Sequence, residues 1–204
     1  MLDTELMDPV RTQLLHQFFA SATHDASAAM CRWTNGLITL SLDEVRELPL
    51  DEVAATLEIG DERLTMVVLT LGGELGGTMV LTFDELNGRQ LAATLLNRPV
   101  ADTEEWTPLE QSALNETGNI LSCAYMNALT RLIDAQLVPS PPIFVQDFGA
   151  SVLEQALMEQ AIECDQVTIC RTGFHREGKS LNWNVIFVPS IKLRETLLGA
   201  LHTA

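Results

Sequence analysis

The sequence predicts one α+β domain with pseudo-twofold symmetry, in which antiparallel sheets pack against two long helices lying side by side. The same order of helix, strand, short helix, hairpin and helix occurs twice, at an offset of about one hundred residues. VLTFDELNGRQLAATLL in the first copy corresponds to VIFVPSIKLRETLLGAL in the second. Each copy supplies only about three strands, too few to cover both faces of its helices, and the connector is short. We therefore expect a single domain over residues 1–204, with repeats at about 8–97 and 105–203.

The first copy opens with a long stretch free of proline and glycine, which Asp8-Pro9 starts and Thr34-Asn35-Gly36 stops. An alternating strand follows, and then two β-branched runs around a glycine-rich loop predict a hairpin. The elements expected in this copy are helix 10–33, strand 37–42, short helix 49–57, hairpin strands 64–71 and 78–83, helix 84–96, and a polar connector over 97–106.

The second copy begins with the most strongly marked helix of the chain. Thr107 can cap its N-terminus, Pro108 suits the first helical position, and Glu110 stands where a capping-box carboxylate reaches back to the cap N–H. No proline follows until Pro139, so the helix can continue to about Ala135. The later elements expected are strand 143–146, helix 151–162, hairpin strands 166–174 and 181–188, and helix 190–201.

The 107–135 helix has an apolar and a polar face. At about 100° per residue, the apolar side chains form a stripe that we expect to be buried: Leu114, Leu121, Ala124, Tyr125, Ala128 and Leu132. The polar side chains gather on the opposite side: Ser112, Glu116, Asn119, Cys123 and Thr130. We name Ser112, Glu116, Asn119 and Cys123 the polar ridge, because residues three and four apart project together.

Gly118 interrupts this helix beside the ridge. A glycine in a helix interior costs about 1 kcal/mol relative to alanine, so a reason for its presence is expected. It lies nearer the apolar face, which favours close packing against the 10–33 helix.

Composition limits the classes of function. The chain has no run of about eighteen apolar residues, which disfavours a membrane span, and its start lacks the pattern of a secretory signal, so we expect a cytoplasmic protein. A formal net charge of −16 disfavours binding to nucleic acid or anionic membranes. The four cysteines show no Cys-x-x-Cys spacing and no histidine at zinc-ligand spacing, so we expect no metal site.

The ridge and the residues after it resemble a known family. Ser112, Glu116 and Asn119, followed after twenty-two further residues by Pro142, are similar to the signature of the CheC/CheX/FliY phosphatases of chemotaxis. ETGNIL and AYMNAL resemble that family as well. The resemblance implies a CheC-like fold of the pseudo-twofold kind. It also implies a phosphatase acting on the phospho-aspartate of a CheY-type response regulator.

The resemblance assigns the catalytic roles to Glu116 and Asn119. Asn119 would orient the attacking water, because its amide oxygen can accept a hydrogen bond from water while its NH₂ donates to a phosphoryl oxygen. Glu116 would pair with a lysine of the regulator, since an exposed glutamate is a weak base at neutral pH. We place Ser112, Pro142 and Cys123 with them as binding residues. The regulator would carry the Mg²⁺, so no cofactor is expected on this chain, and a CheD-type deamidase is left open as a second partner.

The first repeat lacks the catalytic pair. Its alignment with the family puts Gln17 at the Glu position and Ala20 at the Asn position, with His24 opposite Cys123. Alanine has no amide, so the chain resembles a one-site member, and a binding role for Gln17 stays open. The alternative function is a non-catalytic regulator-binding or flagellar-switch module, like the FliM middle domain, which lacks the Glu–Asn pair. The identity of the regulator and the choice between monomer and dimer stay open too.

Overall fold

The computed structural model describes residues 9–72, 75–100, 105–133, 135–163 and 166–201. The ends of the predicted repeats at residues 8 and 203, part of the predicted connector and Cys164 lie outside these ranges. The elements follow the predicted order, with these bounds: α1 Pro9–Trp33, β1 Ile38–Pro49, η1 Leu50–Glu52, α2 Val53–Thr56, β2 Arg63–Leu71, β3 Gly77–Phe83, α3 Glu85–Leu95, α4 Pro108–Ile133, β4 Ile143–Phe148, α5 Gly149–Glu163, β5 Gln166–Arg176, β6 Lys179–Pro189 and α6 Ile191–Leu201.

The six strands form one sheet in the order β1-β5-β6-β3-β2-β4, and every neighbouring pair is antiparallel. The two hairpins, β2–β3 and β5–β6, meet at the centre of the sheet. The first strand of each copy lies at an edge beside the hairpin of the other copy, β1 next to β5 and β4 next to β2. The predicted α+β class with antiparallel strands is confirmed, and the strands of both copies share a single sheet.

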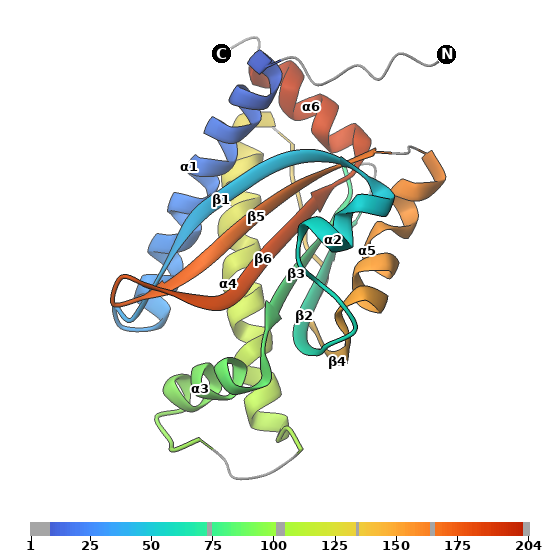
Figure 1. Cartoon of the computed structure of the whole chain (residues 1–204). Coiled ribbons are helices and arrows are strands. Elements are labelled where there is room, and N and C mark those ends of the chain that lie inside the picture. Colours follow the sequence, from blue (N-terminus) through green and yellow to red (C-terminus); the bar gives the residue numbers. More distant parts are fainter. Residues whose placement is uncertain (1–8, 73–74, 101–104, 134, 164–165, 202–204) are drawn as a thin grey trace.

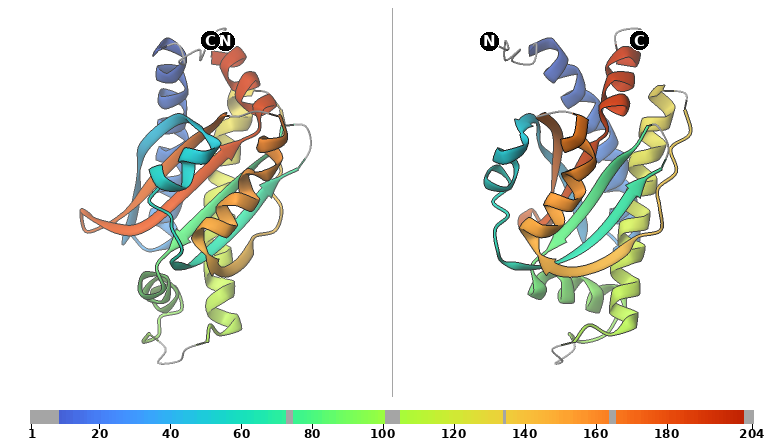
Figure 2. Two further views of the ribbon diagram at one scale, coloured as in Figure 1. Left: turned by 45° about the vertical axis from the view of Figure 1, so that its right-hand side comes forward. Right: turned by 90° about the vertical axis from the view of Figure 1, so that its right-hand side faces the viewer.

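Helices cover both faces of this sheet (Figures 1 and 2). On one face α1 and α4 lie side by side and run antiparallel, with α3 and α6 near opposite ends of α4. On the other face lie α2 and α5, over a second apolar cluster that includes Val53, Leu57 and Leu153. The main core, between the sheet and the long helices, contains the largest fully buried side chains: Tyr125, Phe19, Phe83, Phe174 and Phe187. The predicted pair of long helices is confirmed, and none of the described helices is long and apolar enough to cross a bilayer.

The start of α4 is capped as predicted. The N–H of Thr107 donates to Oε2 of Glu110 at 2.9 Å, and the N–H of Glu110 donates to Oγ1 of Thr107 at 3.3 Å. Glu110 is buried, and its Oε1 lies 3.7 Å from Nη1 of Arg89 on α3. The guanidinium of Arg89 lies over the ring of Trp106, 4.5 Å from its centroid. The beginning of α4 is therefore fixed both by its own cap and by a buried ion pair to α3.

Two local predictions are corrected by the structure. The strand expected at 37–42 continues to Pro49, so the helical segment after it starts with the short turn η1 rather than at Pro49. The closest contact of Gly118 is with β2 and not with α1. A Cβ at this position would lie 2.7 Å from Cγ1 of Val67 on β2, so the close approach is between α4 and the sheet.

Candidate functional site

The structure brings the four residues of the polar ridge together on α4. At about 100° per residue they lie within an arc of about 60° around the helix axis. Ser112, Glu116 and Cys123 are exposed, and Asn119 between them is half-buried. On the opposite side of the helix Leu114, Leu121 and Tyr125 are fully buried. The ridge is thus the solvent-facing side of a helix whose other side is anchored in the core.

Asn119 is the ridge residue with the most defined surroundings. Its Oδ1 accepts a weak hydrogen bond from the thiol of Cys123 at 3.8 Å, and its backbone oxygen accepts one from Oγ of Ser122 at 3.0 Å. Within the described part of the chain, the amide nitrogen has no hydrogen-bond partner. The amide can therefore donate to one ligand atom while its oxygen exchanges the thiol for a stronger donor.

The backbone beneath the ridge is held by contacts on two sides. The hydroxyl of Thr117 donates to the carbonyl of Ala113 at 3.0 Å and accepts from the indole N–H of Trp33 on α1 at 3.3 Å. Gly118 lies against Val67 of β2. This stretch of α4 is therefore fixed between α1 and the sheet, which positions Glu116 and Asn119 on a rigid element.

A buried hydroxyl cluster ties the same helix to its neighbours. Tyr125 on α4 has its hydroxyl 2.7 Å from Oγ1 of Thr23 on α1 and 2.7 Å from Oγ1 of Thr172 on β5. Burial raises the pKa of Tyr125, and the nearby Cys170 raises it further. Sequence reasoning placed Tyr125 in the buried stripe but missed this cluster. The available signal was that a buried tyrosine hydroxyl needs a hydrogen-bond partner.

A groove between α1 and α4 borders the ridge. It has a volume of about 440 Å³, and Cys123 belongs both to its wall and to the ridge. Ala28, Ala29 and Ala124 make it hollow because their side chains are small. An ion pair between Arg131 and Asp25 joins the two helices within it. The ridge therefore has a concave surface next to it, rather than an isolated convex edge.

The remaining predicted residues lie on other elements. Pro142 directly precedes β4, where it stands at the start of the strand. Gln17 and Ala20 lie on α1, the first exposed and the second half-buried. Gln17 follows Pro9 at the same spacing as Glu116 follows Pro108, so the two positions correspond when the starts of the helices are aligned. Because α1 and α4 are antiparallel, Gln17 and Glu116 lie toward opposite ends of the helix pair.

Across the described ranges, no group of three or more His, Cys, Asp or Glu side chains is placed to hold a metal ion. The chemistry that the ridge itself can supply is hydrogen bonding by an amide, a carboxylate, a hydroxyl and a thiol.

Comparison with known proteins relates this geometry to a family. No protein-family model matches the chain. The chain is 28% identical to "CheY-P phosphatase CheC" of Bacillus subtilis over 184 residues, which cover 88% of each protein. The crystal structure of Thermotoga maritima FliY shares the fold with a TM-score of 0.73 and 18% identity, over 97% of this chain and 98% of the chain in that structure. A chain of the CheX–CheY–BeF₃–Mg²⁺ complex from Borrelia burgdorferi matches with a TM-score of 0.54 and 16% identity, over 88% of this chain and 99% of that one. The predicted resemblance to the CheC/CheX/FliY family is thus confirmed, by sequence for CheC and by fold for FliY and CheX.

Proposed function

We propose that this protein is a phosphatase that hydrolyses the aspartyl phosphate of a CheY-type response regulator. One observation carries the proposal: Glu116 and Asn119 stand one turn apart on the solvent-facing side of a fixed helix. The similarity over most of the chain to a protein named as a CheY-P phosphatase supports it. We place the reaction in the cytoplasm, where response regulators receive their phosphoryl groups.

In the proposed reaction the regulator supplies the phospho-aspartate together with its Mg²⁺, which neutralises phosphoryl charge. A water molecule must then be held in line with the bond between phosphorus and the aspartate oxygen. Oδ1 of Asn119 accepts a hydrogen bond from that water, and its NH₂ donates to a phosphoryl oxygen. The water oxygen bonds to phosphorus, the acyl P–O bond breaks, and the aspartate leaves as a carboxylate with inorganic phosphate as the other product. Positioning of this kind can lower the activation free energy by up to about 7–11 kcal/mol when the geometry is ideal.

Glu116 binds the regulator rather than moving a proton. Its carboxylate is exposed on the ridge, and in the proposed complex it pairs with an ammonium group next to the phospho-aspartate. Ser112, one turn earlier, makes a further polar contact, and Cys123 borders the α1–α4 groove that receives the regulator's surface. Pro142 acts through the scaffold, by fixing the start of β4.

A turnover assay tests the proposal. A CheY-type regulator is phosphorylated in the presence of Mg²⁺ and mixed with a tenfold smaller amount of this protein, and released phosphate is measured over time. We expect phosphate release that is faster than spontaneous decay and exceeds the amount of this protein. Binding to the phosphorylated regulator without faster release would instead identify a non-catalytic regulator-binding module. A CheD-type deamidase is tested separately as a second partner, by co-purification.

A further inference from the structure

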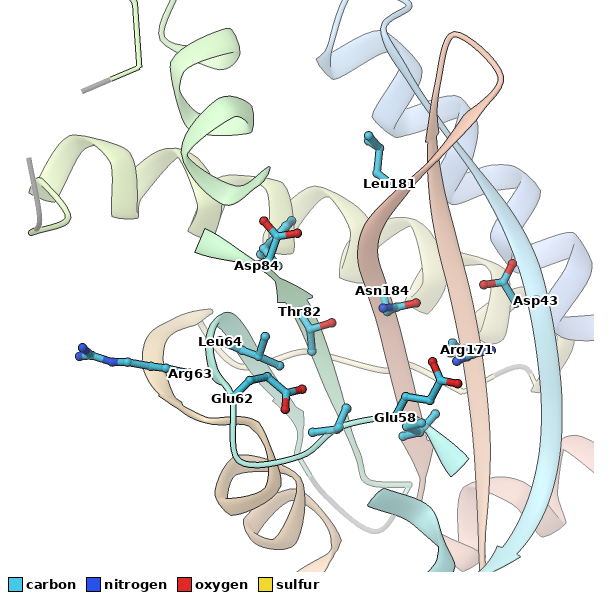
Figure 3. Close-up of a pocket in the computed structure, with 13 residues that line it drawn as sticks. Asp43, Glu58, Glu62, Arg63, Leu64, Thr82, Asp84, Arg171, Leu181 and Asn184 are labelled. Atoms are coloured by element: carbon cyan, nitrogen blue, oxygen red, sulfur yellow. The ribbon is translucent and has the colours of Figure 1, made fainter. Parts of the chain in front are cut away.

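The second face of the sheet contains a hollow that the proposed reaction does not use. It has a volume of about 390 Å³ and lies between the loop that leads from α2 to β2 and the strands β3, β5 and β6 (Figure 3). The polar ridge lies on α4, on the other side of the sheet. A site here would therefore be separate from the ridge, and its test does not depend on phosphatase activity.

The floor of the hollow carries two polar side chains without partners. Thr82 on β3 and Asn184 on β6 are opposite each other in the sheet, and both side chains face the hollow in Figure 3. Thr82 is only 5% exposed. Neither its hydroxyl nor the Asn184 amide has a hydrogen-bond partner within the described ranges. The hydroxyl of Thr82 and the amide of Asn184 are accessible from the hollow, so both are free to form hydrogen bonds with a ligand there.

A glycine leaves space on the floor of the hollow, on the side toward the edge of the sheet. Gly173 on β5 is opposite Asn184, and a Cβ there would lie 2.7 Å from Oδ2 of Asp43. Asp43 stands at the shift in register between Leu42 and Glu44 of β1. The glycine and the register shift together allow the Asp43 carboxylate to lie over the sheet, beside the two unpartnered groups.

Carboxylates dominate the wall of the hollow. Glu58 and Glu62 reach it from the α2–β2 loop, and the carboxylate of Glu58 has no ion-pair or hydrogen-bond partner among the residues described. The guanidinium of Arg171 is already ion-paired with Glu44, with Nε 3.1 Å from Oε1. The side chain of Arg63 points away from the hollow in Figure 3. Together with the carboxylate of Asp43, Glu58 and Glu62 therefore give the hollow an excess of negative charge.

The backbone at Glu58 is strained, so the carboxylate stands at this position at a cost in stability. Glu58 has a φ of 56°, in the left-handed region, at the second residue after α2, directly after its C-cap Leu57. Glycine or asparagine is the usual residue in this position because other side chains are strained there. Replacement of Glu58 by glycine should thus relax the backbone and remove one charge from the wall.

We propose that this hollow binds a small organic cation, an ammonium or guanidinium group on a short aliphatic stem. Asp43, Glu58 and Glu62 face the charge, and Thr82 and Asn184 take its hydrogen bonds on the floor. Leu57, Leu64 and Leu181 in the same lining provide apolar contact for the stem. The volume suits a small molecule, and the unpartnered amide and hydroxyl suit N–H groups better than a bare metal ion, which would take a shell of charged or carbonyl oxygens.

Calorimetric titration with agmatine at constant ionic strength tests the proposal. Butylurea is the uncharged control and Mg²⁺ alone is the metal control. We expect saturable binding of agmatine only. The affinity for agmatine should fall at least about fivefold in Thr82→Val and in Glu58→Gly, because each variant loses one hydrogen bond or one partly exposed charge. Glu154→Gln, an exposed carboxylate on α5 outside the hollow, is expected to leave the affinity unchanged.

Glu58→Gly separates loss of binding from loss of folding. We expect its Tm without ligand to rise by about 2 °C, because the left-handed strain is removed, while its agmatine affinity falls. A blocked arginine dipeptide, titrated in parallel, distinguishes a free small cation from a basic side chain of another protein: tighter binding of agmatine supports the proposal, and binding of the dipeptide alone overturns it. Absence of saturation by about 10 mM, equal binding of butylurea or Mg²⁺, or an equal loss in Glu154→Gln would also overturn it.

Discussion

The thiol of Cys123 donates a hydrogen bond to Oδ1 of Asn119, one turn earlier on α4, over 3.8 Å. Thiols are weak donors, so this contact orients the amide without occupying it firmly. In the proposed reaction the same oxygen accepts a hydrogen bond from the attacking water. The thiol must then give way when the regulator binds, which makes Cys123 the immediate neighbour of the reacting water.

Asn119→Ala tests the water-positioning role directly. We expect kcat for the phosphorylated regulator to fall by at least about 100-fold, because the water loses its oriented acceptor. The Tm is expected to stay within about 1 °C, since the side chain is half-buried and makes only a weak hydrogen bond. Gln155→Ala removes an exposed amide from α5, on the other face of the sheet, and is the matched control that should keep full activity. Equal kcat values for Asn119→Ala and the wild type would remove Asn119 from the mechanism.

Alkylation of Cys123 should block the site. Cys123 is exposed, whereas Cys170 is buried and its burial raises the pKa of its thiol. Because the thiolate is the reactive form, iodoacetamide should modify Cys123 well before Cys170. The added group lies beside Asn119, so we expect activity to be lost in step with modification, as followed by mass spectrometry. Cys123→Ala should keep most of its activity and resist the reagent, and inhibition of that variant at the same rate would point to another cysteine.

Glu116→Lys tests the docking role. A positive charge on the ridge should repel the ammonium group that Glu116 is proposed to meet, so we expect KM for the phosphorylated regulator to rise about tenfold or more. The effect on kcat should be smaller, because Glu116 is not assigned a proton transfer. Glu154→Lys on α5 makes the same change of charge on the opposite face, and it should leave KM near the wild-type value. Similar KM values for the two variants would show that only net charge matters.

Gly118→Ala tests the close contact between α4 and β2. The new Cβ would lie 2.7 Å from Cγ1 of Val67, a stiff and fully buried side chain. Overpacking of this kind costs about 1–3 kcal/mol, which outweighs the gain of about 1 kcal/mol in helix propensity. We expect a net loss of about 1 kcal/mol in the free energy of unfolding, measured with urea. Adding Val67→Ala should recover part of the overpacking cost, so the two changes should be non-additive. A Gly118→Ala protein more stable than the wild type would contradict the contact.

Tyr125 should make the stability sensitive to alkaline pH. Burial raises its pKa above the ordinary value of about 10, so the unfolded chain releases this proton at a lower pH than the folded protein does. The contribution of this pKa difference to the free energy of unfolding is therefore fully present below about pH 10, and it is lost progressively as the pH rises further. The chain contains one tyrosine, so absorbance near 295 nm reports Tyr125 alone. We expect phenolate absorbance to appear only as the circular dichroism of the folded state disappears. A phenolate signal near pH 10 in the folded protein would show that Tyr125 is accessible.

Much of this protein was determined by residues that are close together in the sequence. The capping box of Thr107 and Glu110 joins residues three apart, so it could be predicted and is confirmed. The shared face of Ser112, Glu116 and Asn119 follows from helix periodicity alone. The hairpins were marked by their turns, as in the β5–β6 connection, where Glu177 and Gly178 have φ values of 52° and 76°. Such features need no knowledge of the rest of the chain.

The tertiary structure decided what depends on distant partners. Pairing of β1 with β5 and of β4 with β2 crosses the two repeats, and no local pattern distinguishes it from pairing within each repeat. The packing of α4 on the sheet puts Val67 of β2 against Gly118, so the predicted close contact with α1 was wrong. The pairing of β3 with β6 sets Thr82 opposite Asn184 in the hollow, and the packing of α1 and α4 on β5 puts Tyr125 between Thr23 and Thr172. Side-chain periodicity fixes which face a residue occupies, but the register between strands far apart in the chain is fixed only when the whole core packs.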